Sequence, residues 1–229
     1  MTQFISPLLN KNKLNIIQIA HRGYSDLYPD NSYFAFTEAI NAKFDMIELD
    51  VQITKDCKIV IHHDLFINDK FIIDTTLEDL KSDSILTLER FFKIVNIDNT
   101  KVYLDLKGSY RVAEILYKYL IDNNLHNHKN IYIASFNYKH IQYFVSKNSK
   151  LKLGFITCNH LLPRHLKSIL VHVQFIAFDW QILDKETIKI CKAQNKKVFT
   201  YTCDSDIVFK HMLKFHIDGI VTNYKLRLL

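Results

Sequence analysis

The sequence has few of the residues that mark nucleotide-binding loops, disulfide frameworks and membrane spans. Its four glycines stand alone, so neither the Gly-x-Gly-x-x-Gly turn of dinucleotide-binding folds nor a P-loop is present. Its four cysteines are irregularly spaced without a Cys-x-x-Cys pair, which argues against a zinc knuckle or a disulfide framework and favours reduced thiols. The longest apolar runs are strand-sized, far below the ~18 residues of a membrane-spanning helix. We therefore expect no transmembrane segment.

The composition is that of an ordinary globular protein. With 48% hydrophobic and 24% charged residues, the chain is not of the disordered, collagen-like or coiled-coil class. Its length suits one α/β unit, and we expect residues 1–229 to form a single domain. The net charge of +6 is spread along the chain, so it permits an anionic substrate without requiring nucleic acid. The apolar residues of segment 1–14 are too interrupted for a signal-peptide core, and we expect a cytoplasmic protein.

Short β-rich runs alternate with helical stretches along most of the chain. Several runs are apolar throughout, as strands buried on both faces of a parallel sheet are. Eight or nine such units favour a (β/α)8 TIM barrel, with a doubly wound open sheet as the alternative. The expected helices include 32–43, 111–123 and 185–194, and the expected strands are 15–20, 46–53, 58–62, 102–106, 131–134, 153–156, 175–178, 198–202 and 219–221.

One connection breaks this alternation, because only a few residues separate the second and third expected strands. Parallel strands need a longer crossover, so this pair is expected to be a hairpin. A two-residue turn at 55–56 places Glu48 opposite His63, whereas a turn at 56–57 places Asp50 opposite His63. In both registers the acids and His63 share a face. The segment 66–84 lacks a clear period and is expected to be a loop or small insertion over one end of the barrel.

Titratable side chains follow several of these strands. The first strand ends in His21, Arg22 and Gly23, which suits proton transfer beside an anion at the mouth of a barrel. Such a tripeptide is also common by chance in a solvated loop. The third strand ends in His62, His63 and Asp64, where the hairpin directs His62 away from the acids. His21 and His63 are therefore the candidate imidazoles.

Two further strands carry acids on alternate positions. Glu48 and Asp50 lie on one face of a strand, and Asp105 and Lys107 are two apart on another. Adjacent carboxylates repel unless a cation neutralises them, and a hard divalent cation takes such oxygen ligands; solvated acids at a strand edge are the simpler interpretation. Displacement at phosphorus needs a proton acceptor, a proton donor and positive charge on the non-bridging oxygens, which these residue types supply.

Seven ordered segments of the chain resemble the glycerophosphodiester phosphodiesterases, a family of PLC-like phosphodiesterase TIM barrels. They are IAHRGYSDLYPDNS (19–32), MIELDVQITKD (46–56), IVIHHD (59–64), ILTLERF (85–91), VYLDLKG (102–108), IASF (133–136) and DGIVTN (218–223). The resemblance covers nearly the whole chain. It implies a hydrolase of lipid metabolism that releases sn-glycerol 3-phosphate and an alcohol from small glycerophosphodiesters, with Mg²⁺ or Ca²⁺ as cofactor. It also implies that a glycerol hydroxyl attacks phosphorus first and that water then opens a cyclic phosphate.

The resemblance further assigns residues to roles. His21 and His63 resemble the acid/base pair of the family, and Arg22 and Lys107 match its basic residues around the phosphate. The implied metal ligands are Glu48, Asp50 and Asp105.

The chain departs from the family pattern at a few positions. Asp105 replaces a glutamate ligand and is one methylene shorter, so its approach to a metal is expected to need a shifted backbone or a water. Cys57 replaces a hairpin glycine, and Asp30 and Ser32 replace the Glu and Thr of a Pro-Glu-Asn-Thr motif. Asp204 replaces a neutral amide near the expected substrate position, which could alter head-group preference.

The sequence is also compatible with two other functions. A phospholipase D-like barrel of the spider-toxin type shares the paired histidines and acids and acts on sphingomyelin or lysophospholipids, although such proteins are secreted and disulfide-stabilised. A catalytically lapsed barrel that binds phosphodiesters as a sensor or scaffold is the second, motivated by Asp105 and Asp204.

Overall fold

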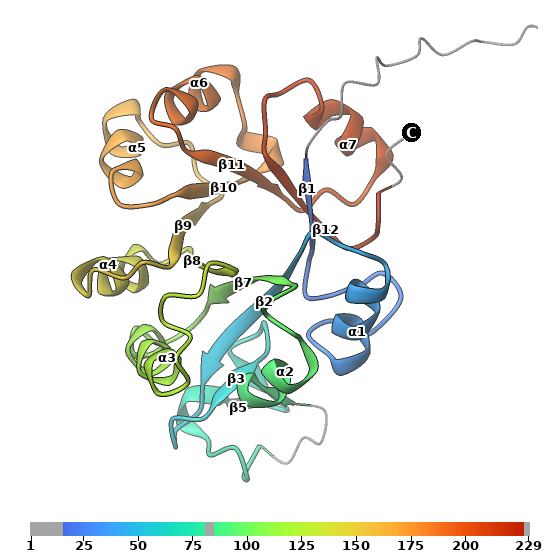
Figure 1. Ribbon diagram of the computed structural model, residues 1–229, viewed down its shortest axis with the longest axis vertical. Helices are drawn as coiled ribbons and strands as arrows, with labels where there is room; N and C mark the ends of the chain where they lie inside the picture. The colour runs from blue at the N-terminus through green and yellow to red at the C-terminus, as the bar shows by residue number, and fades with distance from the viewer. Residues whose placement is uncertain (1–15, 81–84, 227–229) are drawn as a thin grey trace, which may run out of the picture.

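A computed structural model describes residues 16–80 and 85–226, so the segment 1–14 discussed above lies outside the described residues. Eight parallel strands form a closed barrel (Figure 1), which confirms the TIM-barrel prediction. The ring closes because β1 pairs with both β12 and β2, and an open sheet is thereby excluded. The barrel strands are β1 (Ile17–Ala20), β2 (Met46–Ile53), β7 (Lys101–Leu106), β8 (Ile131–Ser135), β9 (Lys152–Thr157), β10 (Phe175–Asp179), β11 (Lys197–Tyr201) and β12 (Gly219–Thr222).

The helices surround this ring of strands (Figure 1). The three predicted helices are confirmed to within two residues at each end, and two begin where a side chain caps the first turn: Ser32 Oγ accepts from the Ala35 amide and Asp184 from that of Thr187. None of the helices in the described residues combines the length and apolar character needed to cross a bilayer. They are α1 (Tyr33–Asn41), α2 (Leu88–Ile94), α3 (Arg111–Asp122), α4 (Tyr138–Ser146), α5 (Pro163–Leu170), α6 (Lys185–Ala193) and α7 (Asp206–Met212).

Two apolar layers stabilise the barrel. The larger lies between strands and helices and includes Phe36 and Phe144, while the smaller fills the barrel interior around Phe175 and Phe199. Gly154 on β9 makes room for this interior packing, because a Cβ there would lie 2.2 Å from the Phe175 ring. The barrel is therefore a packed core closed beneath its carboxyl-terminal mouth.

The expected hairpin between β2 and β3 (Ile59–Ile61) is present, but both predicted registers are wrong. Val51 pairs with Ile61 and Ile53 with Ile59, so the loop contains three residues, 55–57. Cys57 ends this loop in the left-handed region at φ 59°, after a turn in which its amide donates to the Thr54 carbonyl. A three-residue loop with a left-handed last residue shifts the register by one position from either two-residue turn.

The segment after β3 leaves the barrel wall. It contains β4 (Phe66–Ile67), β5 (Lys70–Phe71) and a 3-10 helix η1 (Ile72–Asp74), and it returns through β6 (Leu86–Thr87), which pairs with β3. Its described part packs Ile72 and Leu80 against Val60 of β3. The expected small insertion is therefore present, and residues 81–84 of the predicted segment lie outside the described residues.

Candidate active site

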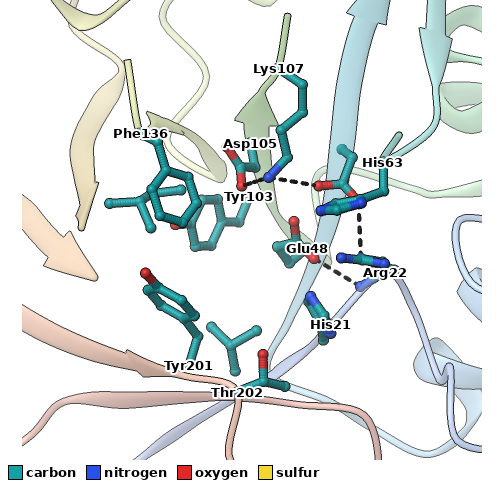
Figure 2. A pocket seen from close by; sticks show the side chains of 13 residues that line it. His21, Arg22, Glu48, His63, Tyr103, Asp105, Lys107, Phe136, Tyr201 and Thr202 are labelled. Atoms are coloured by element: carbon teal, nitrogen blue, oxygen red, sulfur yellow. Dashed lines mark hydrogen bonds and ion pairs between the residues drawn. The ribbon is translucent and has the colours of Figure 1, made fainter. Parts of the chain in front are cut away.

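A pocket of about 180 Å³ opens at the carboxyl-terminal ends of the barrel strands (Figure 2). All seven residues predicted to form the site line this one pocket, although they come from β2, from β7 and the residue after it, and from the segments after β1 and β3. The lining consists of His21, Arg22, Glu48, Asp50, His63, Tyr103, Asp105, Lys107, Phe136, Ile156, Tyr201, Thr202 and Val221.

Strand alternation and register bring three carboxylates together. Glu48 and Asp50 point into the barrel while their neighbours on β2 pack against the helices. Asp105 lies directly opposite Asp50 in the parallel pairing of β7 with β2. Single carboxylate oxygens of Glu48, Asp50 and Asp105 all lie within 4.8 Å of one another, so the shorter Asp105 side chain is part of the cluster.

Asp50 is the most heavily compensated of these acids. Arg22 Nε lies 3.1 Å from Asp50 Oδ2, Lys107 Nζ lies 3.2 Å from Oδ1, and the Asn31 side-chain amide donates to Oδ2 at 2.8 Å. Burial acts to raise the pKa of Asp50, but Lys107 and Arg22 together lower it below its ordinary value. Asp50 is therefore held as a carboxylate.

Glu48 and Asp105 have fewer cationic and hydrogen-bonding groups around their carboxylates. Burial, followed by repulsion from Asp50, raises the pKa of Glu48 well above its ordinary value, and the Arg22 backbone amide donates to its Oε2 at 2.8 Å. Burial raises the pKa of Asp105 to about 7 although Lys107 lies 2.6 Å from its Oδ2. Asp105 Oδ1 is buried and has no hydrogen-bond partner among the described residues. Buried carboxylate oxygens with spare acceptor capacity, at separations that one cation spans, fit a hard divalent ion.

The two histidines occupy different environments. His21 Nδ1 lies 2.6 Å from Asn223 Oδ1, and burial, together with the neighbouring Arg22, lowers the pKa of His21 to about 4, so its ring is neutral at neutral pH. His63 is more exposed, and its Nδ1 lies 2.8 Å from Asp64 Oδ1, with which it forms an ion pair when protonated. The pocket therefore holds two imidazoles that differ in exposure and in the group that contacts their Nδ1 atoms.

His63 reaches the pocket through a loop and not through cross-strand pairing, because β3 ends at Ile61. Gln52 fixes that loop: its Nε2 lies 2.8, 3.2 and 2.6 Å from the carbonyl oxygens of His62, His63 and Asp64. The pattern of β2 already placed Gln52 on the same face as Glu48 and Asp50. Its role was missed because the loop carbonyls that it binds depend on the hairpin register.

Asn31 was also missed. It adopts a left-handed conformation at φ 55°, its backbone amide donates to the Arg22 carbonyl at 2.9 Å, and its side chain contacts Asp50. Asparagine tolerates that conformation better than most residues, which was the available signal in the sequence. Asn31 therefore ties the loop that carries Arg22 to the carboxylate cluster.

An aromatic wall faces the charged side of the pocket (Figure 2). Phe136 and Tyr201 meet edge to face with ring centroids 5.8 Å apart, and Lys107 Nζ lies 5.3 Å from the Phe136 centroid. Asp204 is not among the lining residues; its carboxylate contacts Asn223 instead. This side of the pocket is therefore bounded by rings and not by the Asp204 carboxylate.

Known proteins share this architecture. The sequence matches the glycerophosphoryl diester phosphodiesterase family over residues 21–225. It is 28% identical to a glycerophosphodiester phosphodiesterase of Caldanaerobacter subterraneus, over 92% of this chain and 95% of that protein. Among solved structures it is similar to a glycerophosphodiester phosphodiesterase from Parabacteroides distasonis, with a TM-score of 0.81 at 23% identity over 91% of this chain and 93% of the other.

A second solved structure is similar in fold. It is a phosphodiesterase from Oleispira antarctica in complex with the product sn-glycerol-3-phosphate, with a TM-score of 0.79 at 18% identity over 90% of this chain and 92% of the other. These structural likenesses concern the fold, whereas the family match covers most of the sequence and includes every residue that lines the pocket. The chain belongs to the glycerophosphoryl diester phosphodiesterase family, whose members are phosphoric diester hydrolases.

Proposed function

We propose that this protein is a metal-dependent enzyme that hydrolyses glycerophosphodiesters to sn-glycerol 3-phosphate and an alcohol. The observation that carries the proposal is one pocket in which neutral His21 and carboxylate-paired His63 accompany three buried carboxylates. The product-bound Oleispira antarctica phosphodiesterase, which shares the fold, supports glycerol phosphate as the product class. The unpaired thiols of all four cysteines agree with the cytoplasm as the proposed location.

The charged groups divide into two sets. Glu48, Asp50 and Asp105 would hold Mg²⁺ or Ca²⁺, which when bound supplies positive charge to the phosphate oxygens. Arg22 and Lys107 line the same pocket and bind the phosphate of the substrate from the protein side. Both already contact Asp50, so the acid that anchors the ligand cluster also orients the cations that meet the substrate.

The histidines move the protons. A hydroxyl of the glycerol moiety attacks phosphorus and transfers its proton to His21 Nε2, while His63 protonates the oxygen of the departing alcohol. The product of this step is a cyclic phosphate. Water then opens the ring by the reverse transfers: it loses a proton to His63, and His21 returns its proton to the glycerol oxygen, giving sn-glycerol 3-phosphate. The hydrogen bonds of both Nδ1 atoms leave Nε2 of each ring for these transfers.

A substrate panel tests the proposal. The purified chain is incubated with glycerophosphocholine, glycerophosphoethanolamine and lysophosphatidylcholine, and the released alcohol and glycerol phosphate are measured with chelator and after re-addition of Mg²⁺ or Ca²⁺. We expect release of sn-glycerol 3-phosphate that chelator abolishes and a divalent ion restores. Choline release from lysophosphatidylcholine alone would replace this function with that of a phospholipase D-like barrel. Binding without turnover of any diester would replace it with a lapsed, phosphodiester-binding barrel.

A further inference from the structure

We propose that Asp204 is a positioning residue for this reaction: acting through the Asn223 side chain, it holds His21 in the tautomer whose Nε2 is free to accept a proton. The inference rests on the proposed function, in which His21 is the first proton acceptor. Asp204 does not line the pocket, so any effect on the reaction passes through other side chains.

A continuous series of hydrogen bonds joins Asp204 to His21. The Asn223 backbone amide donates to Asp204 Oδ1 and its side-chain Nδ2 donates to Oδ2, both at 2.8 Å. Asn223 Oδ1 lies 2.6 Å from His21 Nδ1. Ser25 Oγ lies 3.0 Å from the same Asn223 oxygen and donates to the His21 carbonyl at 2.8 Å.

The direction of donation along these hydrogen bonds is set by the Asp204 carboxylate, which can only accept. An ionised carboxylate has only acceptor atoms, so the nitrogen of the Asn223 amide must face it. The Asn223 oxygen then necessarily faces His21, and the hydrogen must lie on His21 Nδ1. A neutral imidazole carries one hydrogen, so its Nε2 keeps a lone pair. An acid outside the pocket therefore sets which nitrogen of His21 can act as a base.

The backbone holds the members of this chain in place. His21, Asp204 and Asn223 follow β1, β11 and β12, which are adjacent in the barrel. The His21 amide donates to the Thr222 carbonyl at 3.0 Å, and the Asp26 amide donates to the Asn223 carbonyl at 3.1 Å. The three side chains thus meet because of the strand order, although Asp204 and His21 are far apart in the sequence.

An amide side chain at position 204 would no longer fix the direction of the hydrogen bonds between residue 204, Asn223 and His21. An Asn side chain offers one acceptor and one donor to the two donors of Asn223, so one contact becomes donor against donor. Rotation of the Asn223 amide removes that conflict and presents its nitrogen to His21. His21 Nδ1 then accepts, the hydrogen moves to Nε2, and the base function is lost.

The experiment compares Asp204→Asn with the exchange variant Asp204→Asn/Asn223→Asp, in which an acid at 223 again accepts from His21. The matched control is Asp206→Asn, which neutralises an exposed acid two positions away, outside the pocket and outside this chain of contacts. The side-chain ¹⁵N spectrum of the full chain, labelled on histidine, reports the His21 tautomer at neutral pH without substrate. Turnover of glycerophosphocholine with Mg²⁺ gives kcat and KM.

We expect Nδ1–H in the unaltered chain and in Asp206→Asn, and Nε2–H in Asp204→Asn, with kcat reduced about 100-fold or more and KM within about threefold. The exchange variant should recover the Nδ1–H tautomer, and its kcat should return to at least about a tenth of that of the unaltered chain. An Nε2–H tautomer in the unaltered chain, or a loss of kcat in Asp204→Asn without a tautomer change, overturns the inference. Should Asp204→Asn fail to fold, Asn223→Ala, which removes the acceptor, must shift the same spectrum. An unaltered chain that is inactive yet shows Nδ1–H contradicts the proposed function and not the tautomer assignment.

Discussion

Asp50 and Asp105 lie opposite each other on adjacent parallel strands, and Lys107 Nζ bridges them, 3.2 Å from Asp50 Oδ1 and 2.6 Å from Asp105 Oδ2. One ammonium thus serves two buried carboxylates, while Glu48 nearby has no cationic side chain in ion-pair contact among the described residues. Three acids and too little compensating charge give the pocket a deficit of positive charge in the absence of a cation. The first prediction follows from this deficit.

Glu48→Gln is expected to stabilise the metal-free protein while abolishing its stabilisation by a divalent cation. The neutral amide avoids the cost of burying Glu48 beside Asp50, where burial and the Asp50 carboxylate already raise the pKa of Glu48 well above its ordinary value. Urea unfolding in chelator and in excess Mg²⁺ measures both effects, because a ligand of the folded state stabilises by mass action. The exposed Glu114→Gln serves as control. Equal Mg²⁺ stabilisation of Glu48→Gln and the unaltered chain would contradict the assignment of Glu48 as a ligand.

His21→Ala and His63→Ala are each expected to lower kcat for alcohol release by about 10²–10⁴-fold, the usual contribution of a positioned acid or base. Neither side chain belongs to the carboxylate cluster, so the thermal shift caused by Mg²⁺ should persist in both variants. The exposed His172→Ala is the matched control and should turn over normally. Full activity in either site variant would remove that histidine from the mechanism.

The contribution of Asp105 to the stability of the metal-free protein should fall as pH rises from about 4 to 7. Its pKa is about 7 in the folded chain against 3.8 ordinarily, so the folded state binds the proton more tightly. The stability that this proton contributes is complete below the ordinary value and is lost as pH rises through 7, by at most about 4 kcal/mol. In urea unfolding from pH 4 to 8 in chelator, Asp105→Asn should gain stability relative to the exposed control Asp122→Asn as pH rises, because it lacks the Asp105 contribution. Parallel profiles would refute the raised pKa.

Two local features explain how much of the molecule the sequence predicted: the alternation of side chains along a strand, and the position of a residue at a strand end. Alternation along β2 put Glu48 and Asp50 on one face, and the strand-end position of His21 put it at the mouth of any parallel barrel. These features are local, so they need no knowledge of loop geometry. The barrel itself followed from the same alternation of strands and helices.

Loop geometry accounts for what was missed. The β2–β3 hairpin closes with a non-glycine residue, Cys57, in a left-handed conformation, and that choice between turn types changes the register by one residue. The contact of Asp204 with Asn223 depends on the neighbouring order of β11, β12 and β1 around the closed barrel. Such contacts are set by tertiary packing, and no short sequence pattern encodes them.

Gln52→Met is expected to lower kcat about tenfold or more while leaving the Mg²⁺-induced thermal shift intact. Methionine is close in shape to glutamine but has no donor for the carbonyls of His62, His63 and Asp64, so the loop that carries His63 loses its anchor on β2. A displacement of about 1 Å at a proton donor is enough for a large loss of rate, whereas the carboxylate cluster does not include Gln52. The exposed Gln181→Met controls for the loss of an amide elsewhere. Because the defect lies in the proton donor, substrates with more acidic leaving groups, such as nitrophenyl glycerophosphate, should recover most of the rate in Gln52→Met. An equal loss of rate for choline and nitrophenyl esters would instead indicate a general distortion of the pocket.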